Sequence, residues 1–272
     1  MVKAVNTRAQ RIRERLLLDG EVEFSALAAE FGVSEMTVRR DIDALESEGL
    51  VRKVIGGAIA LSKISEPTFE ARASLDMASK QHVADYAVSQ LSPHETIVLD
   101  SGSTALAVAR TIRGRDLALT VITPSLLVAT ELRAEPDTTI LLTGGLLRPG
   151  ELSLIGIEAV ESFRRYNCDT FIMGVAGVHA RRGFTDYHRD ESAVKRAAIE
   201  ASDRLIVLAD RSKVGRAHLS SIAPLSAAEI IVTDAAADDP ALAAAAASGV
   251  SVVSVAAASD GTGTGVDGER AS

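Results

Sequence analysis

The chain has 272 residues, and 47% of them are apolar, so it is long enough to form two domains with separate hydrophobic cores. Its net charge is −8, and the acidic excess falls after residue 63 because the two signs nearly balance before that point. The single cysteine, Cys168, excludes an intrachain disulfide and a cysteine zinc cluster. No apolar stretch approaches the length of a membrane span, so we expect a cytoplasmic protein.

The first helical pattern carries clustered positive charge. Apolar Ile12, Leu16 and Leu17 recur at helical spacing, and Gly20 then offers a left-handed stop. Five cations that are opposed only by Glu14 favour a basic arm able to contact phosphate: Lys3, Arg8, Arg11, Arg13 and Arg15.

Two further helices are predicted on either side of a glycine turn. Ser25 is the expected N-cap of the first, which ends at Gly32. Ser34 is the expected N-cap of the second, which closes at Gly49. One face of this second helix is apolar, with Val38, Ile42 and Leu45, and the opposite face exposes Thr37, Arg39 and Arg40.

This helix-turn-helix spacing predicts a DNA-reading element. A helix fits the major groove, and residues near its N-terminus reach base edges while the preceding helix contacts the backbone. Thr37 and Arg40 are the strongest candidates for base contacts, with Ser34 at the start of the helix beside them. Arg39 is a candidate for phosphate contact. The plainer alternative is that the two arginines belong to a solvated helix face.

A β-hairpin wing is expected after this helix, in the stretch LVRKVIGGAIAL, with the turn at Gly56–Gly57. Arg52 and Lys53 on its first strand are candidates for phosphate contacts. We place the DNA-binding domain at residues 1–62. Residues 63–76 lose clear periodicity around Pro67 and are interpreted as an interdomain linker or a short packing strand.

The segment VSEMTVRRDIDALESEGLVRKVIGGAIA resembles the N-terminal domain of bacterial repressors of the DeoR family. This resemblance implies a winged helix-turn-helix. The family usually has a histidine immediately before Gly-Gly-Ala, whereas this chain has Ile55, so the contact of that side chain is left open.

Beyond residue 76, short apolar runs alternate with helical patterns, as in TIVLD, LALTVIT, TTILLTGG, CDTFIMGV, DRLIVLAD, EIIVTD and VSVVSV. This alternation predicts an α/β domain with a parallel sheet over residues 77–256. Residues 257–272 are rich in small residues and are expected to form a disordered tail.

The carboxyl ends of these strands carry polar residues, and ligands of open α/β sheets bind at such ends. After TIVLD, a Ser-Gly-Ser-Thr turn leads into a helix and is suited to an anion such as phosphate. The candidate effector-binding residues are Asp100, Ser101, Gly102, Ser103, Thr104, Gly144, Gly145, Arg148, Asp190, Glu191, Lys195, Asp210 and Lys213. Lys195 and Lys213 are expected to neutralise a phosphoryl group, and Asp100 or Asp190 to hold sugar hydroxyls. For each lysine a surface ion pair is an equal alternative.

The motifs DSGST, TGGLLRPGELSLIG, DESAVKRA and ADRSKVG resemble the C-terminal sensor domain of the DeoR family. The resemblance implies an effector that is a phosphorylated sugar or related metabolite, and a fold similar to ribose-5-phosphate isomerase. Met173, Ala176 and Gly177 stand where those isomerases carry acidic residues, so we expect ligand binding without turnover.

Several alternatives were weighed against this interpretation. An isomerase-like enzyme with an appended DNA-binding module would need a free carboxylate base, and a constitutive architectural DNA binder would ignore small molecules. A metal site built from His179, Asp186 and His188 does not match an ordinary zinc spacing, so we expect no metal or cofactor and interpret that loop as a lid hinged at Gly183. Cys168 is interpreted as a buried strand residue.

The sequence therefore predicts a DNA-binding transcription regulator, a repressor of carbohydrate catabolism genes, that is not an enzyme. Its expected partners are an operator in double-stranded DNA, a phosphorylated small-molecule effector and a second copy of itself, because helix-turn-helix proteins commonly bind two-fold-related half-sites.

Overall fold

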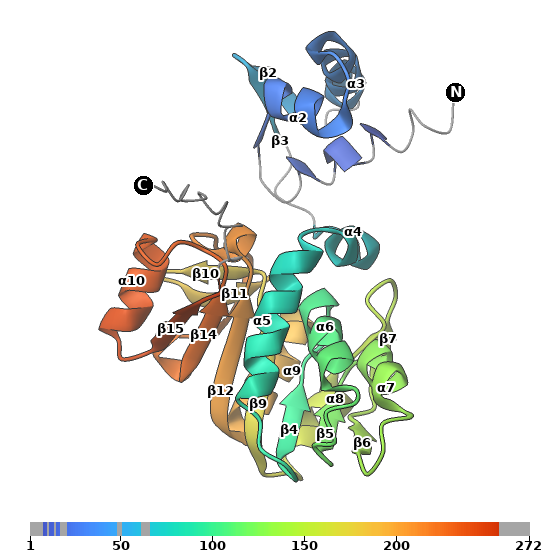
Figure 1. Cartoon of the computed structure of the whole chain (residues 1–272), viewed down its shortest axis with the longest axis vertical. Helices are drawn as coiled ribbons and strands as arrows, with labels where there is room; N and C mark the ends of the chain where they lie inside the picture. The colour runs from blue at the N-terminus through green and yellow to red at the C-terminus, as the bar shows by residue number, and fades with distance from the viewer. Residues whose placement is uncertain are drawn as a thin grey trace, which may run out of the picture.

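A computed structural model describes residues 8–9, 11–13, 15–16, 21–47, 51–60 and 66–255. A small N-terminal domain precedes a larger α/β domain, and α4 is the first element after the small domain (Figure 1). The predicted tail at 257–272 lies outside the described residues. Within the described segments, no helix is long and apolar enough to cross a membrane.

The small domain is a helix-turn-helix with a three-stranded sheet. Residues 8–9, 11–13 and 15–16 are helical, and they are followed by β1 (Glu21–Glu23), α2 (Phe24–Phe31), α3 (Glu35–Ser47), β2 (Val51–Val54) and β3 (Gly57–Ala60). Its core includes Ile12, Leu16 and Phe24, and the predicted apolar face of α3, with Val38, Ile42 and Leu45, packs into the same cluster. The predicted amphipathic pattern of the recognition helix is therefore confirmed.

The boundaries of these helices differ in part from those predicted. Ser25 lies inside α2, because the helix begins one residue earlier at Phe24 and its N-cap is Glu23, without a side-chain cap. Gly32 ends α2 in the left-handed conformation with φ 62°, as expected. Ser34 accepts a hydrogen bond from the backbone N–H of Thr37 at 3.3 Å, as an N-cap does.

The wing is a β-hairpin, but its turn lies one residue earlier than predicted. Val54 pairs with Gly57, so the two turn residues are Ile55 and Gly56. Strand β1, which was not predicted, pairs with β3 in the order β1-β3-β2. Gly57 therefore lies in β3 opposite Glu23, where an added Cβ atom would clash with the backbone oxygen of Val22.

Three of the five cations expected to form a basic arm have partners within the small domain, and their contact with phosphate stays a prediction. Arg8 donates to both oxygens of the buried Asp41 at 2.6 and 3.2 Å, which ties the first helical segment to α3. Arg11 lies 5.3 Å from the ring centre of Phe31, and Arg15 pairs with Glu30 at 3.5 Å. These side chains hold the domain together through charge-assisted and cation–π contacts.

The segment predicted to be a linker or a short strand contains a helix. Thr68 caps α4 (Phe69–Ser74) by accepting from the N–H of Ala71, and α5 (Met77–Ser89) follows directly. The loss of apolar periodicity around Pro67 is explained because α4 has only 6 residues and buries Ala71 alone.

The larger domain is built on a parallel sheet, and all seven predicted strands are present in it. The strands, in sheet order, are β15 (Ser251–Ser254), β14 (Ile230–Thr233), β12 (Ser202–Ala209), β9 (Cys168–Gly174), β4 (Thr96–Leu99), β5 (Thr120–Thr123) and β6 (Thr139–Leu142). Every neighbouring pair in this sheet is parallel. Their near-continuous apolar runs are typical of strands that are buried on both faces.

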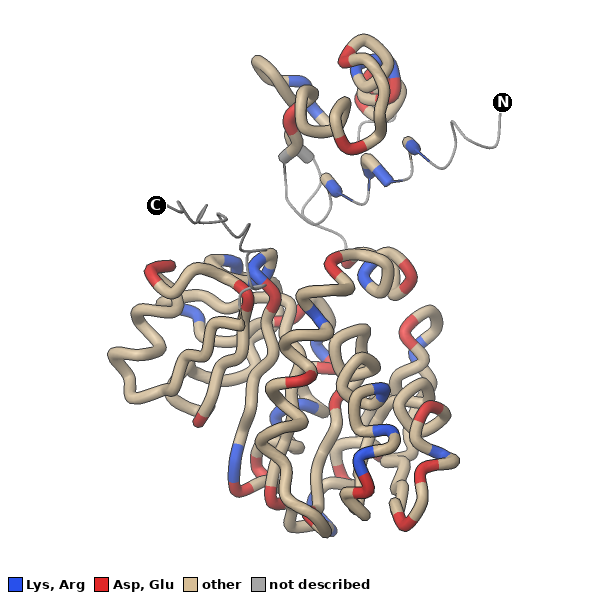
Figure 2. Tube along the Cα trace, viewed as in Figure 1, with Lys and Arg blue, Asp and Glu red and all other residues tan. Residues whose placement is uncertain are grey.

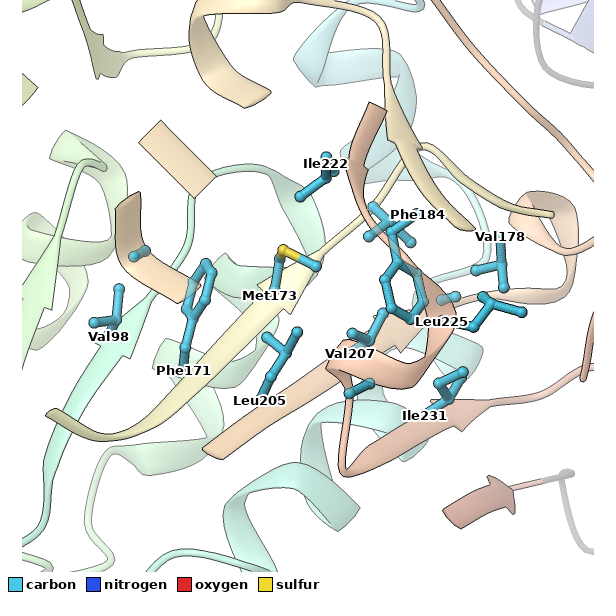
Figure 3. Close-up of a cluster of buried hydrophobic side chains, with 14 of the residues drawn as sticks. Val98, Phe171, Met173, Val178, Phe184, Leu205, Val207, Ile222, Leu225 and Ile231 are labelled. Atoms are coloured by element: carbon cyan, nitrogen blue, oxygen red, sulfur yellow. The ribbon is translucent and has the colours of Figure 1, made fainter. Parts of the chain in front are cut away.

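Helices cover both faces of the sheet. One face packs against α5, α6 (Ser103–Ile112) and α7 (Leu126–Leu132), and the other against α8 (Ile157–Phe163), α9 (Arg189–Glu200) and α10 (Pro240–Ala247). Alternate strand residues serve the two cores: Phe171 and Met173 enter one, while Ile172 between them enters the other (Figure 3). This period of two is what a strand imposes.

Short antiparallel strands complete the larger domain. The hairpin of β7 (Leu146–Arg148) and β8 (Ser153–Ile155) leads into α8. A separate sheet has the order β10 (Gly177–His179), β11 (Gly183–Asp186) and β13 (Ser220–Ala223), and two 3₁₀ turns are present, η1 (Arg211–Lys213) and η2 (Leu225–Ala227). Phe184 of β11 and Ile222 of β13 pack into the core with Met173 (Figure 3).

The close approach of β1 to β3 yields a test of the small domain. Gly57→Ala is expected to destabilise this domain by about 1–3 kcal/mol, because the added methyl group must push β1 away. The free energy of unfolding from urea titration, together with DNA binding, measures the effect. Gly56→Asn is the matched control, because its Cβ meets nothing and Asn tolerates the positive φ of 79°. Equal stability of the two variants would contradict the packing.

Candidate functional site

The order of the strands places a crevice between β4 and β9. From β4 the chain adds β5 and β6 on one side of the sheet, and it then returns to add β9, β12, β14 and β15 on the other side. The direction of winding thus reverses between β4 and β9, and ligands of open α/β sheets bind at the carboxyl ends of the strands at such a point. The topology alone indicates where a site should lie.

A pocket opens at this point. It is lined by residues that follow β4, β9 and β12, by α9 and by the segment around α4, and also by Arg15 of the small domain: Arg15, Glu66, Arg72, Leu75, Asp76, Lys80, Ser101, Gly102, Ser103, Thr104, Glu151, Gly174, Val175, Ala176, Asp186, Tyr187, Glu191, Lys195, Asp210, Ser212 and Lys213. Eight of the thirteen predicted effector-binding residues are among them. The predicted convergence of the strand ends is therefore seen in the structure.

The N-terminus of α6 faces this pocket. Gly102 is its N-cap residue with φ 94°, and no side chain caps the helix. Ser103 and Thr104 form the first turn, so their backbone N–H groups and hydroxyls lie at the positive end of the helix dipole. Such an end is suited to an anionic group.

A buried lysine holds the floor of the pocket together. The Lys195 ammonium group lies 2.6 Å from Asp186, 3.2 Å from Asp100 and 2.8 Å from the carbonyl oxygen of Gly174. Burial alone would lower the pKa of Lys195, but the two carboxylates raise it, so the lysine stays charged. Lys195 is therefore engaged in ion pairs within the protein, which was the stated alternative to a ligand contact, and its neutralising a phosphoryl group stays a prediction.

The two carboxylates beside Lys195 differ in their environment. Burial raises the pKa of Asp100 to about 6, although Lys195 opposes this. Asp100 also accepts hydrogen bonds from the N–H groups of Ser101 and Gly174, at 2.8 and 3.0 Å. Burial would raise the pKa of Asp186 too, but Lys195 lowers it. Both oxygens of each side chain are therefore occupied, with Asp186 held ionised by its close ion pair.

Lys213 is the contrasting cation. The turn that carries it begins at Asp210, whose carboxylate accepts from the N–H of Ser212 at 3.0 Å. Within the described part of the chain, the Lys213 ammonium group has no hydrogen bond and no close ion pair, although it is half-buried at the pocket. Burial lowers the pKa of Lys213, and Asp210 offsets only part of that effect. An anion in the pocket would relieve this cost.

A network of ion pairs borders the other side of the pocket. Arg72 of α4 pairs with Glu66 at 3.0 Å and with Glu151, and Arg148 pairs with Glu66 and, at 2.8 Å, with Glu191. Acidic and basic segments are adjacent along α4 (Figure 2). All five side chains are largely buried, so removing one member would leave a costly unpaired charge.

Five of the predicted effector-binding residues lie outside the lining of the pocket. Asp100 is next to it, beneath Lys195, and Asp190 is exposed on α9. Arg148 is engaged with its two glutamates. Gly144 and Gly145 have positive φ, and a Cβ on Gly145 would lie 2.5 Å from the Ile155 oxygen. Close packing of the chain against β8 therefore explains Gly145.

The sequence analysis missed most of the residues that the α4 region contributes. Arg72 was passed over because residues 63–76 were interpreted as a linker. Lys80 was passed over because the apolar spacing of Val83, Ala84 and Ala87 that marks α5 was not used. Asp186 was considered only as a metal ligand, although it lies on β11 beside Lys195.

The loop from His179 to His188, which was interpreted as a lid, has a different geometry. The Nδ1 atom of His179 accepts from the N–H groups of Arg181 and Arg182, and among the described residues no group of three or more His, Cys, Asp or Glu could hold a metal ion. Gly183 lies in the sheet against Ala223, so the expected hinge is wrong. Cys168 is buried at the start of β9, as predicted, and burial raises the pKa of its thiol to about 11.

The exposed face of α3 carries the predicted DNA-contacting residues. Arg40 is exposed and has no ion pair or hydrogen bond among the described residues. Arg39 lies 4.6 Å from the ring centre of Phe24 and 3.6 Å from Glu35, so it is partly held within the domain. Thr37 is half-buried, with its hydroxyl 3.0 Å from that of Ser34. Arg40 is thus the most available cation on this helix.

The wing carries the other two candidates. Arg52 is exposed on β2. The Lys53 ammonium group lies 2.5 Å from Asp43 and 3.4 Å from Glu46, and it ties the wing to α3. Exposed pairs of this kind contribute little and exchange readily. Ile55 at the turn is fully exposed.

These features define a two-domain transcription regulator in which a helix-turn-helix implies DNA binding and an α/β domain implies a small-molecule effector. Residues 8–64 match the DeoR-like helix-turn-helix domain, and residues 76–235 match the DeoR C-terminal sensor domain. The chain belongs to the DeoR family.

Relatives of similar length support this assignment. The regulator GolR of Listeria innocua is 31% identical, over 84% of this chain and 89% of its own. The regulator GlpR of Haloferax volcanii is 30% identical, over 90% and 96%. The glycerol-3-phosphate regulon repressor of Escherichia coli K12 is 28% identical, over 84% and 90%. Among solved structures, ribose-5-phosphate isomerase A of Methanocaldococcus jannaschii is similar over 50% of this chain and 53% of its own. The TM-score is 0.37 and the sequence identity is 18%.

The buried lysine provides a test of the site. Lys195→Met is expected to destabilise the protein by about 3–5 kcal/mol at pH 8, because Asp100 and Asp186 lose their cation. Without the Lys195 ammonium group, the pKa values of Asp100 and Asp186 in the folded protein rise above their values in the unfolded chain. As the pH falls, the folded protein therefore binds protons before the unfolded chain does, and this stabilises it. The deficit should therefore shrink at pH 5.5. Urea unfolding at both pH values measures it, with Arg113→Met as the surface control. An equal deficit at both pH values would contradict the assignment.

Proposed function

We propose that this protein is a repressor of carbohydrate catabolism genes whose operator binding changes when a phosphorylated sugar or related metabolite occupies the pocket. The observation that carries the proposal is Lys213, a half-buried cation with no close partner among the residues that the structure describes, at the same pocket as the N-terminus of α6, where Gly102 offers no side-chain cap. A phosphoryl group would satisfy both, since each favours negative charge.

The remainder of the pocket is suited to hydroxyl groups. Carboxylates outnumber cations along its lining, and the carboxylates of Asp76 and Asp210 are acceptors of the kind that sugar hydroxyls need. The pocket thus combines a small anion-binding end with a polar, acidic remainder. One relative is named as the repressor of a glycerol-3-phosphate regulon, which supports a phosphorylated polyol or sugar as the effector class.

Binding without turnover is favoured over an isomerase-like reaction. An enediol mechanism needs a carboxylate that is free to accept a proton from the substrate. Asp100 and Asp186 are each occupied by Lys195 and by backbone N–H groups. Met173 is buried in the core, and Gly177 has no room for a side chain because the Arg216 oxygen lies 2.5 Å from the position of its Cβ.

For DNA recognition we infer that Arg40 and Thr37 contact base edges and that Arg39, Arg52 and Lys53 contact phosphates, with Ser34 fixing the start of α3. The exposure of Arg40 near the N-terminal end of α3 supports its assignment. Because one chain carries one helix-turn-helix, a two-fold homo-oligomer on paired half-sites is the geometry that this domain favours.

The effector assignment predicts a loss of ligand response in Lys213→Met. Ribose 5-phosphate at 100 times its Kd would stabilise the wild-type protein by about 2.7 kcal/mol, and the variant should lose most of this gain while retaining operator binding in the absence of ligand. Thermal unfolding with ribose 5-phosphate, and with ribose as the uncharged control, measures it.

Arg133→Met, which changes the exposed C-cap residue of α7, is the matched control. If a screen of phosphorylated sugars and polyols stabilises neither the wild-type protein nor the variants, a constitutive architectural DNA binder becomes the better description. Release of isomerised sugar phosphate by the wild-type protein would instead support an enzyme.

The DNA assignment predicts that Arg40→Ala weakens operator binding by about 1–3 kcal/mol and relaxes selectivity at one base pair. An operator obtained by selection from random DNA, followed by mobility shifts at fixed salt, measures both. Arg52→Ala should weaken binding to all sequences alike, because a phosphate contact reads no base. Undiminished selective binding by Arg40→Ala would overturn the base contact.

A further inference from the structure

Helix α4 joins the small domain to the pocket. It lies between residues 66 and 75, and the side chain of its Arg72 lines the pocket. Both ends of α4 are fixed by residues around the pocket. Glu66 pairs with Arg72 and Arg148 before the helix, and the Lys80 ammonium group donates to the carbonyl oxygens of Arg72 and Leu75 at its end.

The partners of Arg72 come from separate parts of the chain. Its guanidinium group donates to Glu66 at 3.0 Å, to the Pro67 oxygen at 2.7 Å and to Glu151, which lies between β7 and β8. Two arginines, Arg72 and Arg148, share three carboxylates in this network, so one negative charge remains uncompensated. Burial raises the pKa of Glu151 in spite of Arg72, so this carboxylate is costly to keep ionised.

We propose that Arg72 is an effector-binding residue, and that its guanidinium group exchanges Glu151 for the anionic group of the ligand when the pocket is occupied. This rests on the proposed function, because it assumes an anionic ligand. A planar guanidinium group binds a phosphoryl group through two parallel hydrogen bonds, so the exchange replaces one charged partner with another of suitable geometry. The cation that would bind the ligand, Arg72, already lines the pocket.

The exchange couples the pocket to the DNA-binding domain. When Arg72 turns from Glu151 to the ligand, α4 loses its direct ion pair with the β7–β8 hairpin and retains the contacts with Lys80 and with Glu66, which Arg148 of β7 also binds. Arg15 of the small domain lines the same pocket, so both sides of the junction are affected. A ligand that contacts α4 differently in two arrangements shifts the balance between them, and this is the requirement for an allosteric effect.

Two substitutions with opposite effects test the exchange. Arg72→Gln should weaken ribose 5-phosphate binding about tenfold or more, because a charged hydrogen-bond donor is lost. Glu151→Gln should strengthen it about three- to tenfold, because the ligand no longer competes with a carboxylate for Arg72. Isothermal titration at pH 8 measures both, and Arg72→Lys, which keeps the charge, provides a second measurement if Arg72→Gln fails to fold.

Glu191→Gln separates the exchange from simple charge repulsion. It removes the same charge from the same pocket but leaves Arg72 paired, since Glu191 bonds to Arg148 and to Ser153. Its gain in affinity should be smaller than that of Glu151→Gln. Glu131→Gln, in a surface pair with Arg113, should leave the affinity unchanged. Equal gains for Glu151→Gln and Glu191→Gln would overturn the exchange.

Hydrogen exchange of the peptide spanning residues 66–76 gives a direct view of α4 in the full-length protein. Ribose 5-phosphate should change its exchange rate in the wild-type protein, and Glu151→Gln should raise that rate without ligand. If ribose 5-phosphate binds but Arg72→Gln binds it equally well, or the exchange of residues 66–76 does not respond, this inference fails while the proposed function stands. If no phosphorylated compound binds at all, the proposed function fails.

Discussion

The ion pairs of Lys195 are the constraint on which the larger domain depends. This one ammonium group, carried by α9, joins carboxylates and a carbonyl oxygen from β4, β9 and β11 at the point where the winding of the sheet reverses. Three charges buried this closely are tolerated only when each has its partner. Because Asp100 in turn accepts from Ser101, the same arrangement fixes the turn that leads into α6. The shape of the pocket thus follows from a buried charge balance.

The three lysines of the pocket have different roles, and these roles determine where an anion can bind. Lys195 is neutralised within the protein, and Lys80 is used to hold the end of α4. Lys213 lines the cavity, and no residue in the described part of the chain pairs closely with it. One unsatisfied cation beside an open helix N-terminus defines a local anion site in a pocket whose lining is otherwise acidic, and this combination favours a ligand with one phosphoryl group and several hydroxyl groups.

Sequence patterns predicted the elements that have strong periodicity. The seven parallel strands were identifiable because each is a short, nearly continuous apolar run, and α3 was identifiable because Val38, Ile42 and Leu45 share one face. Helix α4 and strands β7, β8, β10 and β13 were missed because they are 3 to 6 residues long and carry little periodic signal. Side-chain pairing was also beyond the sequence: the DESAVKRA motif placed Lys195 near the pocket, but its capture by Asp186 depends on a strand that was not predicted.

The central claim is that occupancy of the pocket and binding of the operator are coupled. Thermodynamic linkage requires the coupling to be reciprocal, so the most direct measurement is a complete cycle: the Kd for ribose 5-phosphate, or the best compound from the screen, with free and operator-bound protein, and the operator Kd with and without that compound. The predicted result is a change of about 5- to 150-fold that is equal in both directions. Tight binding of the ligand with identical affinity for the free and the operator-bound protein would contradict the claim.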